Sequence, residues 1–224
     1  MSLLTNLVSY YALDGNSTDS VGANNGTDTA MTYTATGALI GQMGVFNGTT
    51  SYISTADTPF NPGSGDFTIN CWLKTSATGT VVAAGKYGGS GDTYWLGFVS
   101  GAIRFELKSG TYDITTTATT YNDNAWHMVS AWRASGVQYL AIDNGTPQSL
   151  ANTTTIAPTG NLMLGKFGSG NTFFYPGDMD EFGYWSRALT STEITQLYNS
   201  GAGLAYPFGL TSYTPDPMMH LMQM

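Results

Sequence analysis

The chain has 224 residues, of which 42% are hydrophobic and only 10% are charged. That is enough to bury one sizeable core, and all-β sandwiches of this length commonly fold as one domain. Fifteen acidic and seven basic residues give a formal net charge of −8, and Lys and Arg do not cluster anywhere. Binding to nucleic acid requires a cationic stripe, so we expect no nucleic-acid partner.

The sequence shows neither a secretion signal nor a membrane span. The N-terminus lacks a basic region followed by an apolar one, and no run approaches the ~18 apolar residues of a spanning helix. A single cysteine, Cys71, excludes an intrachain disulfide, and its position in the run 67–73 predicts a buried thiol. We expect an extracellular location or a place on the surface of a larger particle such as a virion.

Turn signals and strand-like runs alternate through most of the chain. Asp-Gly and Asn-Gly dipeptides, which favour turns with positive φ, occur at residues 14–15, 25–26, 47–48 and 144–145. The runs predicted as strands are residues 7–13, 52–54, 67–74, 81–84, 94–99, 103–107, 127–133, 137–142, 162–166 and 179–185. Many short strands with regular turns predict an all-β antiparallel sandwich of two sheets.

One short helix is predicted after these strands. Thr190 and Glu193 fit a capping box, in which each side chain bonds the other residue's backbone. Ile194 and Leu197 then begin an apolar stripe at helical spacing. Gly201 is the predicted stop signal, because glycine readily adopts the left-handed conformation that ends a helix.

The composition changes after residue 205. Pro207, Pro215 and Pro217 break regular structure, and four methionines fall within residues 218–224. We therefore divide the chain into a sandwich domain, residues 1–205, and an extended Met- and Pro-rich C-terminal tail, residues 206–224. The tail is either an arm that docks on its own domain or on a neighbouring molecule, or a frayed terminus. A homo-oligomer or assembly subunit is expected, because an apolar tail is costly to leave in water.

A series of short motifs follows in one order between about residues 7 and 200. The motifs lie at residues 7–15, 19–20, 25–27, 46–48, 52–53, 65–69 with Trp72, 126–129, 139–145, and 177–182 with 187–189. This order resembles the LamG-like jelly-roll family of the concanavalin A-like lectin/glucanase superfamily. The resemblance implies two antiparallel sheets of about six or seven strands each, often with a calcium ion at the rim. It does not fix the function, because this fold serves lectins, enzymes and structural modules.

Three aspartates are the candidate calcium ligands. In the predicted closing strand, period two places Asp180 on the same face as Phe182, so Asp180 points to the core rim if Phe182 points inward. A carboxylate there needs a cation or hydrogen-bond donors. Asp14 and Asp19 can converge on it, and calcium takes six to eight oxygens, which loop carbonyls and water complete. We predict a structural calcium held by these three residues. The alternative is that they cap turns or pair with Arg187.

The catalytic pattern of the superfamily's glucanases is missing from the sequence. Retaining glucanases of this superfamily carry two Glu about four residues apart on one strand, because acid and nucleophile must flank the sugar. The three glutamates here, Glu106, Glu181 and Glu193, are not so spaced. The two histidines, His127 and His220, are far apart and make no zinc motif, and His127 is expected to be a structural, hydrogen-bonded side chain. We expect the protein not to be an enzyme.

Aromatic residues beside two glycine-containing loops are the candidate glycan contacts, since binding sites for small ligands combine aromatic faces with a few polar groups. Tyr87, Tyr94 and Trp95 flank the loop at 88–91, and Phe173 and Tyr175 follow the loop at 168–171. The alternative for each is a place in the core, because 29 aromatic side chains must pack somewhere.

Two functions stay open at this point. The first is a non-catalytic carbohydrate-binding or adhesion module whose partners are glycans or cell-surface polysaccharide. The second is a structural virion protein, such as a phage decoration or tail component, that docks on other virion proteins through its C-terminal tail. The two can coexist, because a protein displayed on a particle can also hold glycans.

Overall fold

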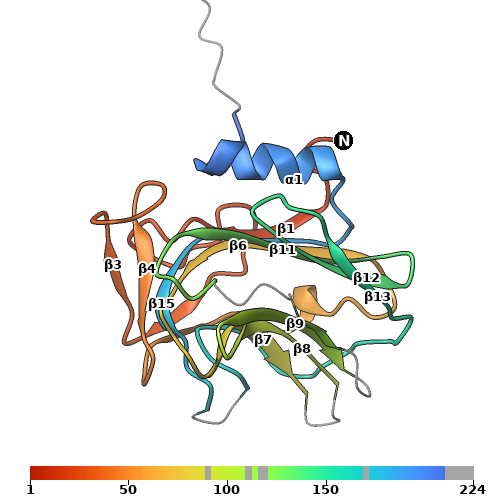
Figure 1. The fold of residues 1–224 in the computed structure, drawn as a ribbon, viewed down its shortest axis with the longest axis horizontal. Coiled ribbons are helices and arrows are strands. Elements are labelled where there is room, and N and C mark those ends of the chain that lie inside the picture. Colours follow the sequence, from red (N-terminus) through yellow and green to blue (C-terminus); the bar gives the residue numbers. More distant parts are fainter. Residues whose placement is uncertain (89–91, 109–112, 116–120, 169–171, 210–224) are drawn as a thin grey trace, which may run out of the picture.

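The computed structural model describes residues 1–88, 92–108, 113–115, 121–168 and 172–209 (Figure 1). Most of both loops named above, residues 89–91 and 169–171, lies outside the described residues. The same holds for residues 210–224, which include His220 and the Met-rich part of the tail.

Two antiparallel sheets stack face to face (Figure 1). The first sheet has eight strands in the order β13 (Gln148–Ala151), β12 (Val137–Ile142), β11 (His127–Ala134), β6 (Phe67–Lys74), β15 (Pro176–Trp185), β4 (Met43–Asn47) and β3 (Thr32–Thr34), with β1 (Leu7–Tyr11) paired to β15. The second has seven strands in the order β10 (Asp113–Thr115), β9 (Ala102–Lys108), β8 (Thr93–Val99), β7 (Thr80–Tyr87), β14 (Leu162–Leu164), β5 (Tyr52–Ser54) and β2 (Thr27–Thr29). This confirms the predicted all-β, two-sheet jelly-roll sandwich.

All ten predicted strand runs form strands, whereas five further strands were not predicted. The missed strands are β2, β3, β4, β10 and β13, each only three to five residues long. Runs this short carry too few alternations to be distinguished from loops. Conversely, β14 ends at Leu164 rather than at residue 166, because Gly165 turns the chain with φ +86°.

The main core lies between the sheets and follows period-two alternation. In β8, Tyr94, Leu96 and Phe98 are buried in this core, so the residues between them face outward. Cys71 is fully buried in the same cluster, as predicted, and burial raises the pKa of its thiol well above the ordinary value.

A second apolar cluster covers the outer face of the eight-stranded sheet. Tyr10, Trp72 and Trp185 from that sheet pack there against the helix residues Ile194 and Leu197. Figure 1 shows helix α1 (Ser191–Tyr198) and the N-terminal segment lying over this sheet, on the side away from β7, β8 and β9. Within the described ranges, no helix is long and apolar enough to cross a membrane.

Helix α1 begins as predicted and ends earlier than predicted. The capping box between Thr190 and Glu193 is formed in both directions. The helix ends at Tyr198, because Asn199 adopts the left-handed conformation with φ 47° and its side-chain amide donates to the Gly203 carbonyl at 2.7 Å. Gly201 is therefore not the stop signal; a 3-10 turn, η2 (Asn199–Gly201), follows instead.

The first residues assigned by sequence to the tail pack on the sandwich. The Phe208 ring lies 5.1 Å from that of Tyr10 and 6.4 Å from that of Trp185. Tyr206 lies 5.7 Å from Tyr10. The packed part of the chain thus continues to the end of the described residues at 209.

Candidate functional site

The outer face of the seven-stranded sheet carries an aromatic cluster in the described part of the chain. The Phe167 ring lies 5.5 Å from Tyr87, 6.4 Å from Trp95 and 6.5 Å from Phe173. Tyr87 and Phe173 remain 43% and 48% exposed. No helix of the described residues covers this sheet as α1 covers the other (Figure 1), so these rings are available to a ligand.

Local sequence explains how Phe167 reaches the sheet. Gly85 faces outward opposite Trp95, and a Cβ at that glycine would stand 3.1 Å from the Phe167 ring. The absent side chain therefore leaves room for the ring. Phe173 is held by a hydrogen bond from the Val82 amide to its carbonyl oxygen at 2.9 Å, and its φ of 56° is rare for a bulky residue.

A pocket of about 380 Å³ opens beside Tyr87 on this face. We call it the Tyr87 pocket, and it is lined by Ser54, Tyr87, Thr159, Gly160, Asn161, Met163 and Gly168. Its polar groups converge: the Asn161 side-chain amide donates to the Ser54 hydroxyl at 3.0 Å, and both stand beside the exposed ring. The volume lies near the lower end of the ~300–1,000 Å³ typical of small-molecule sites.

Two glycines allow the wall of the Tyr87 pocket to approach the end of β7. A Cβ at Gly160 would stand 2.5 Å from the Tyr87 carbonyl oxygen. A Cβ at Gly88 would stand 2.8 Å from the backbone of both Pro158 and Thr159. Because any side chain at either position would push the two segments apart, the pocket depends on both glycines.

The five predicted glycan contacts have different positions in the structure. Tyr87 and Phe173 are exposed on the outer face, whereas Trp95 faces outward but is only 8% exposed beneath Phe167 and Arg104. Tyr94 and Tyr175 are fully buried in the core.

The two buried tyrosines are bound by the chain itself. Tyr94 donates from its hydroxyl to the Phe60 carbonyl at 2.9 Å, and Tyr175 donates to the Lys74 carbonyl at 3.0 Å. Their hydroxyls are thus satisfied internally, and no ligand reaches them. Sequence position beside a loop does not distinguish them from Tyr87, because residues next to one another in the chain can face opposite sides of a sheet.

Sequence reasoning missed the polar half of the pocket. The sequence predicts Ser54 to lie in a strand but indicates no binding role for it, and no motif marks Asn161 or Phe167. The alternation around buried Ile53 does predict that Ser54 faces outward. The alternation does not reveal which strand lies beside β5. The pairing of β5 with β14 brings the other pocket residues next to Ser54.

The three predicted calcium ligands are used by the chain in other ways. Asp19 is buried and caps its own loop: its carboxylate accepts hydrogen bonds from the amides of Tyr10, Val21 and Asn24 at 3.0–3.2 Å. Asp14 is exposed and accepts from the Gln42 amide at 2.5 Å. Asp19 thus caps its own loop, as in the alternative, whereas Asp14 bonds a segment 28 positions away in the chain.

Asp180 lies on the opposite face of β15 from the one the spacing predicted. A β-bulge between Asp180 and Gly183, with Glu181 at φ 54°, shifts the alternation by one residue. Phe182 consequently points into the core. Asp180 lies opposite Trp72 in the pairing of β15 with β6, on the face of the sheet that carries the second apolar cluster.

Burial around the bulge creates two carboxyls with raised pKa values. Asp180 is fully buried, and burial raises its pKa to about 8 even though the amides of Leu39 and Ile40 donate to one of its oxygens. Burial likewise raises the pKa of Glu181 to about 7, against the hydrogen bond that the Tyr10 hydroxyl donates to it. The second oxygen of Asp180 has no partner in the described structure.

The predicted calcium site stays a prediction. Among the described residues, no group of three or more His, Cys, Asp or Glu is placed so that it could hold a metal ion. Oxygens of Asp14 and Asp19 accept hydrogen bonds from backbone amides, and of these two residues only Asp14 is near enough to Asp180 to help raise its pKa. An effect of calcium on the protein stays a prediction that the experiments below include.

His127 is a hydrogen-bonded structural residue, as predicted. Its ring nitrogens lie 2.7 Å from an Asp143 oxygen and 3.1 Å from an Asp123 oxygen. The hydrogen bond to Asp143 raises the pKa of His127, despite partial burial. Both ring nitrogens are thus occupied.

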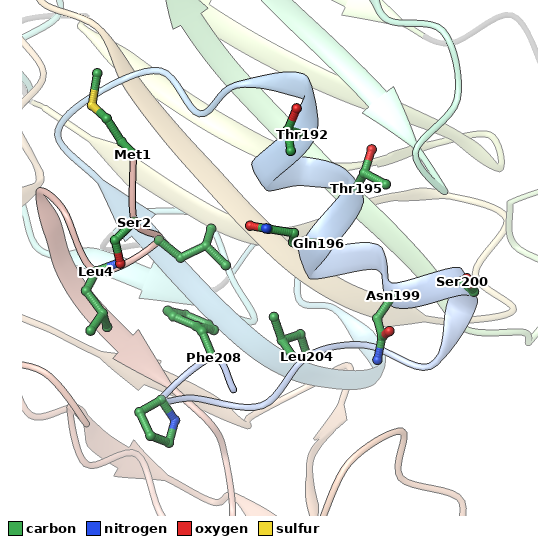
Figure 2. A pocket seen from close by; sticks show the side chains of 12 residues that line it. Met1, Ser2, Leu4, Thr192, Thr195, Gln196, Asn199, Ser200, Leu204 and Phe208 are labelled. Atoms are coloured by element: carbon green, nitrogen blue, oxygen red, sulfur yellow. The ribbon is translucent and has the colours of Figure 1, made fainter. Parts of the chain in front are cut away.

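A larger cavity of about 590 Å³ lies on the other side of the molecule, between the N-terminus, α1 and the last described segment. Figure 2 shows Leu204 and Phe208 beneath the helix, with Met1 and Leu4 on the facing segment. We call it the α1 groove. Its walls are mainly aliphatic and small polar side chains. The one aromatic side chain in its lining, Phe208, packs on Tyr10. It therefore lacks the exposed aromatic face of the Tyr87 pocket.

Comparisons with solved structures give the same fold at low sequence identity. The binding domain of Paraclostridial Mosquitocidal Protein 1 matches with a TM-score of 0.76 and 18% identity, over 89% of this chain and 53% of that one. Domain 4 of an extracellular arabinanase from Geobacillus stearothermophilus, in complex with arabinotriose, matches with a TM-score of 0.68 and 20% identity, over 85% and 97%. The chain spans about half the length of the toxin binding domains that it matches.

A structure of botulinum neurotoxin type C, whose cell entry depends on two ganglioside molecules, matches with a TM-score of 0.70 and 13% identity, over 88% of this chain and 52% of that one. No curated protein matches the chain in sequence. A family model does: Laminin_G_3, described as concanavalin A-like lectin/glucanases superfamily, matches residues 47–195, which is more than half of the chain. The chain therefore belongs to the Laminin_G_3 family of the concanavalin A-like lectin/glucanase superfamily.

Proposed function

We propose that this protein is a non-catalytic carbohydrate-binding module and that the Tyr87 pocket is its binding site. The observation that carries the proposal is an exposed aromatic ring beside an amide and a hydroxyl, on the sheet face that α1 leaves open. A sugar offers an apolar ring face to stack on Tyr87 and hydroxyls to bond Asn161 and Ser54.

The structural neighbours support a binding role. The toxin structures are binding domains, and the arabinanase domain is in complex with arabinotriose. At 20% identity or less these likenesses establish the fold alone, so the site rests on this chain's own residues. The exposed Phe173 ring extends the aromatic surface beyond the pocket and offers a second contact for an oligosaccharide.

The test is a glycan array followed by titration calorimetry of the full-length protein, in calcium and then in EDTA. We expect binding to a defined saccharide class, and Tyr87→Ala should weaken it about tenfold or more, the equivalent of ~1.4 kcal/mol of lost contact. Asn161→Ala should also weaken binding, because it removes the amide that bonds sugar hydroxyls.

Tyr139→Ala provides the matched control. Tyr139 is a half-buried tyrosine on the eight-stranded sheet, where its ring stacks on Trp132 at 5.0 Å. Its removal should leave the affinity unchanged. An unchanged affinity of Tyr87→Ala would exclude the Tyr87 pocket as the site. Loss of binding in EDTA would support calcium as a cofactor.

A second proposed function is assembly on a larger particle, such as a virion, through the C-terminal tail, which also implies display outside the cell. The observation in its favour is the α1 groove itself, a cavity of about 590 Å³ whose lining includes the apolar side chains of Leu3, Leu204 and Phe208. We propose that this groove receives the apolar segment 218–222 of a neighbouring copy.

Light scattering coupled to size-exclusion chromatography tests the assembly role. The full-length chain should form an oligomer, and a chain ending at residue 209 should be a monomer. Equal masses for the two chains would contradict the assembly role while leaving the carbohydrate proposal untouched.

A further inference from the structure

Lys166 is a buried cation that forms no ion pair within the described residues. It is only 4% exposed, and its Nζ lies 4.0 Å from the centroid of the Tyr52 ring and 5.9 Å from that of Phe174. The aromatic faces attract the ammonium but supply no hydrogen-bond acceptor in the ring plane. A buried ammonium is ordinarily paired with an anion.

The other buried cations among the described residues each have either an anion or hydrogen-bond acceptors. Lys86 bonds the Asp57 carboxylate at 2.5 Å, and Arg187 pairs with Glu193 at 2.7 Å. Arg133 donates to three backbone carbonyls at 2.6–2.9 Å. Lys166 differs from these residues because its ammonium has neither an anion nor a hydrogen-bond acceptor among the described residues. Its N–H groups are therefore free to bond a ligand.

Lys166 lies on the same face as the Tyr87 pocket and close to it. Tyr52 and Ser54 are two residues apart on β5, on either side of the core residue Ile53, so both face outward. At the rise of a β-strand they are about 7 Å apart. Ser54 lines the Tyr87 pocket, and the Lys166 ammonium lies over the ring of Tyr52. The positive charge is therefore close to the pocket. Gly168, two residues after Lys166, lines the pocket as well.

The strands around Lys166 present neutral side chains outward. On β2, β14 and β5 the outward positions are occupied by Thr27, Thr29, Met163, Tyr52 and Ser54. Asp28, the acidic residue of β2, bonds the hydroxyls of Ser17 and Tyr33 instead. In a chain of net charge −8, this patch thus offers one cation to an incoming anion, and the described outward positions of these three strands carry no carboxylate.

We propose that Lys166 binds the anionic group of an acidic sugar, a uronate-type carboxylate or a sulfate ester, whose neighbouring ring occupies the Tyr87 pocket. This inference rests on the proposed carbohydrate-binding function and names its ligand class. Charge-assisted hydrogen bonds are stronger than neutral ones, and the two aromatic faces hold the lysine in place before the ligand arrives.

The test compares three oligosaccharides of equal length by titration calorimetry of the full-length protein: a uronate-containing one, its carboxyl-reduced neutral counterpart, and a sulfated one. We expect the uronate or the sulfated compound to bind about tenfold more tightly than the neutral one, and the preference to shrink as salt rises. Which of the two binds more tightly identifies the anion.

Lys166→Met tests the residue, because it keeps the aliphatic stem and removes the charge. It should lower the affinity for the acidic saccharide to that for the neutral one and leave the neutral affinity unchanged. Lys166→Arg should retain the preference, because it retains the charge. Lys74→Gln is the matched control, since Lys74 pairs with Asp178 on the eight-stranded sheet at 3.2 Å.

The outcomes separate this inference from the function on which it rests. Equal binding of neutral and acidic saccharides by the wild-type protein would overturn the inference but not the proposed carbohydrate-binding function. This comparison uses the wild-type protein alone, so it does not depend on whether a variant folds. An equal loss of both affinities in Lys166→Met, with Lys166→Arg behaving like it, assigns Lys166 a purely structural role. If the protein binds none of the saccharides, both proposals are wrong.

Discussion

Two buried carboxyls, those of Asp180 and Glu181, set the main pH dependence that we expect of the fold, and the larger shift is that of Asp180. Burial raises its pKa from 3.8 to about 8, so the folded chain keeps a proton that the unfolded chain releases near pH 4. The free energy of unfolding must then fall as the pH rises from about 4 to about 8, because the folded state binds more protons over that window.

Asp180→Asn should remove the Asp180 part of this dependence and leave the smaller part due to Glu181. The Asn side-chain oxygen can still accept from the amides of Leu39 and Ile40, and no charge is left to bury. We expect the variant to be more stable than the wild type at pH 8, by about 1–3 kcal/mol, and the gain to shrink at pH 5. Urea denaturation at the two pH values measures both.

Asp178→Asn is the control, since Asp178 lies on the same strand but pairs with Lys74 near the surface. A loss of stability of Asp180→Asn at pH 8 would contradict the argument from burial. Repeating the measurement in calcium addresses the metal prediction: stabilisation of the wild type and not of Asp180→Asn would support Asp180 as a ligand.

At the scale of elements, helix α1 is fixed to the sandwich by one buried ion pair. Glu193 accepts hydrogen bonds from the Arg187 guanidinium at 2.7 and 2.8 Å and from the Thr190 amide at 2.9 Å. Burial acts to raise the pKa of Glu193, but these hydrogen bonds outweigh it and lower the pKa to about 2. The Arg187 side chain also bonds the carbonyls of Ser2 and Thr5, which ties the N-terminal segment to the helix.

Glu193→Ala should cost about 3–5 kcal/mol, because it leaves the Arg187 guanidinium buried without its anion. Thr190→Ala, which removes only the cap, should cost about 1 kcal/mol. In the wild type, the stability that Glu193 contributes is present above pH 4.5 and is lost as the pH falls from there toward 2.

Guanidinium denaturation of both variants, with the exposed Ser191→Ala as control, checks the order of these costs. If Glu193→Ala were no more costly than Ser191→Ala, the ion pair would contribute nothing to the attachment of α1.

At the scale of the whole molecule, residues that the sequence assigns to the C-terminal tail pack on the sandwich. Tyr206 and Phe208 lie on the second apolar cluster with Tyr10 and Trp185. A chain ending at residue 205 loses these contacts, whereas one ending at 209 keeps them.

Thermal unfolding should therefore distinguish the two truncations. The chain ending at 205 should unfold about 5–10 °C below the chain ending at 209, since two half-buried aromatic side chains are lost. Equal midpoints for the two truncations would mean that residues 206–209 add nothing to the fold.

The sequence by itself determined the layered architecture and the N-terminal cap of α1. Both follow from local rules: alternation along the runs around Ile69 and Leu96 produces two-faced strands, and the spacing of Thr190 and Glu193 produces the capping box. Burial of Cys71 follows from the same alternation.

Only the tertiary structure decided which face Asp180 occupies and which aromatics are accessible. One bulge residue at Glu181 reverses the side of Asp180, and local spacing does not reveal a bulge. The Tyr87 pocket likewise joins strands β5, β7 and β14 to the loop at 159–161, and its assembly depends on strand pairing between residues 76 to 111 positions apart in the chain. Period two tells which residues of a strand share a face, but strand pairing and packing decide what covers that face.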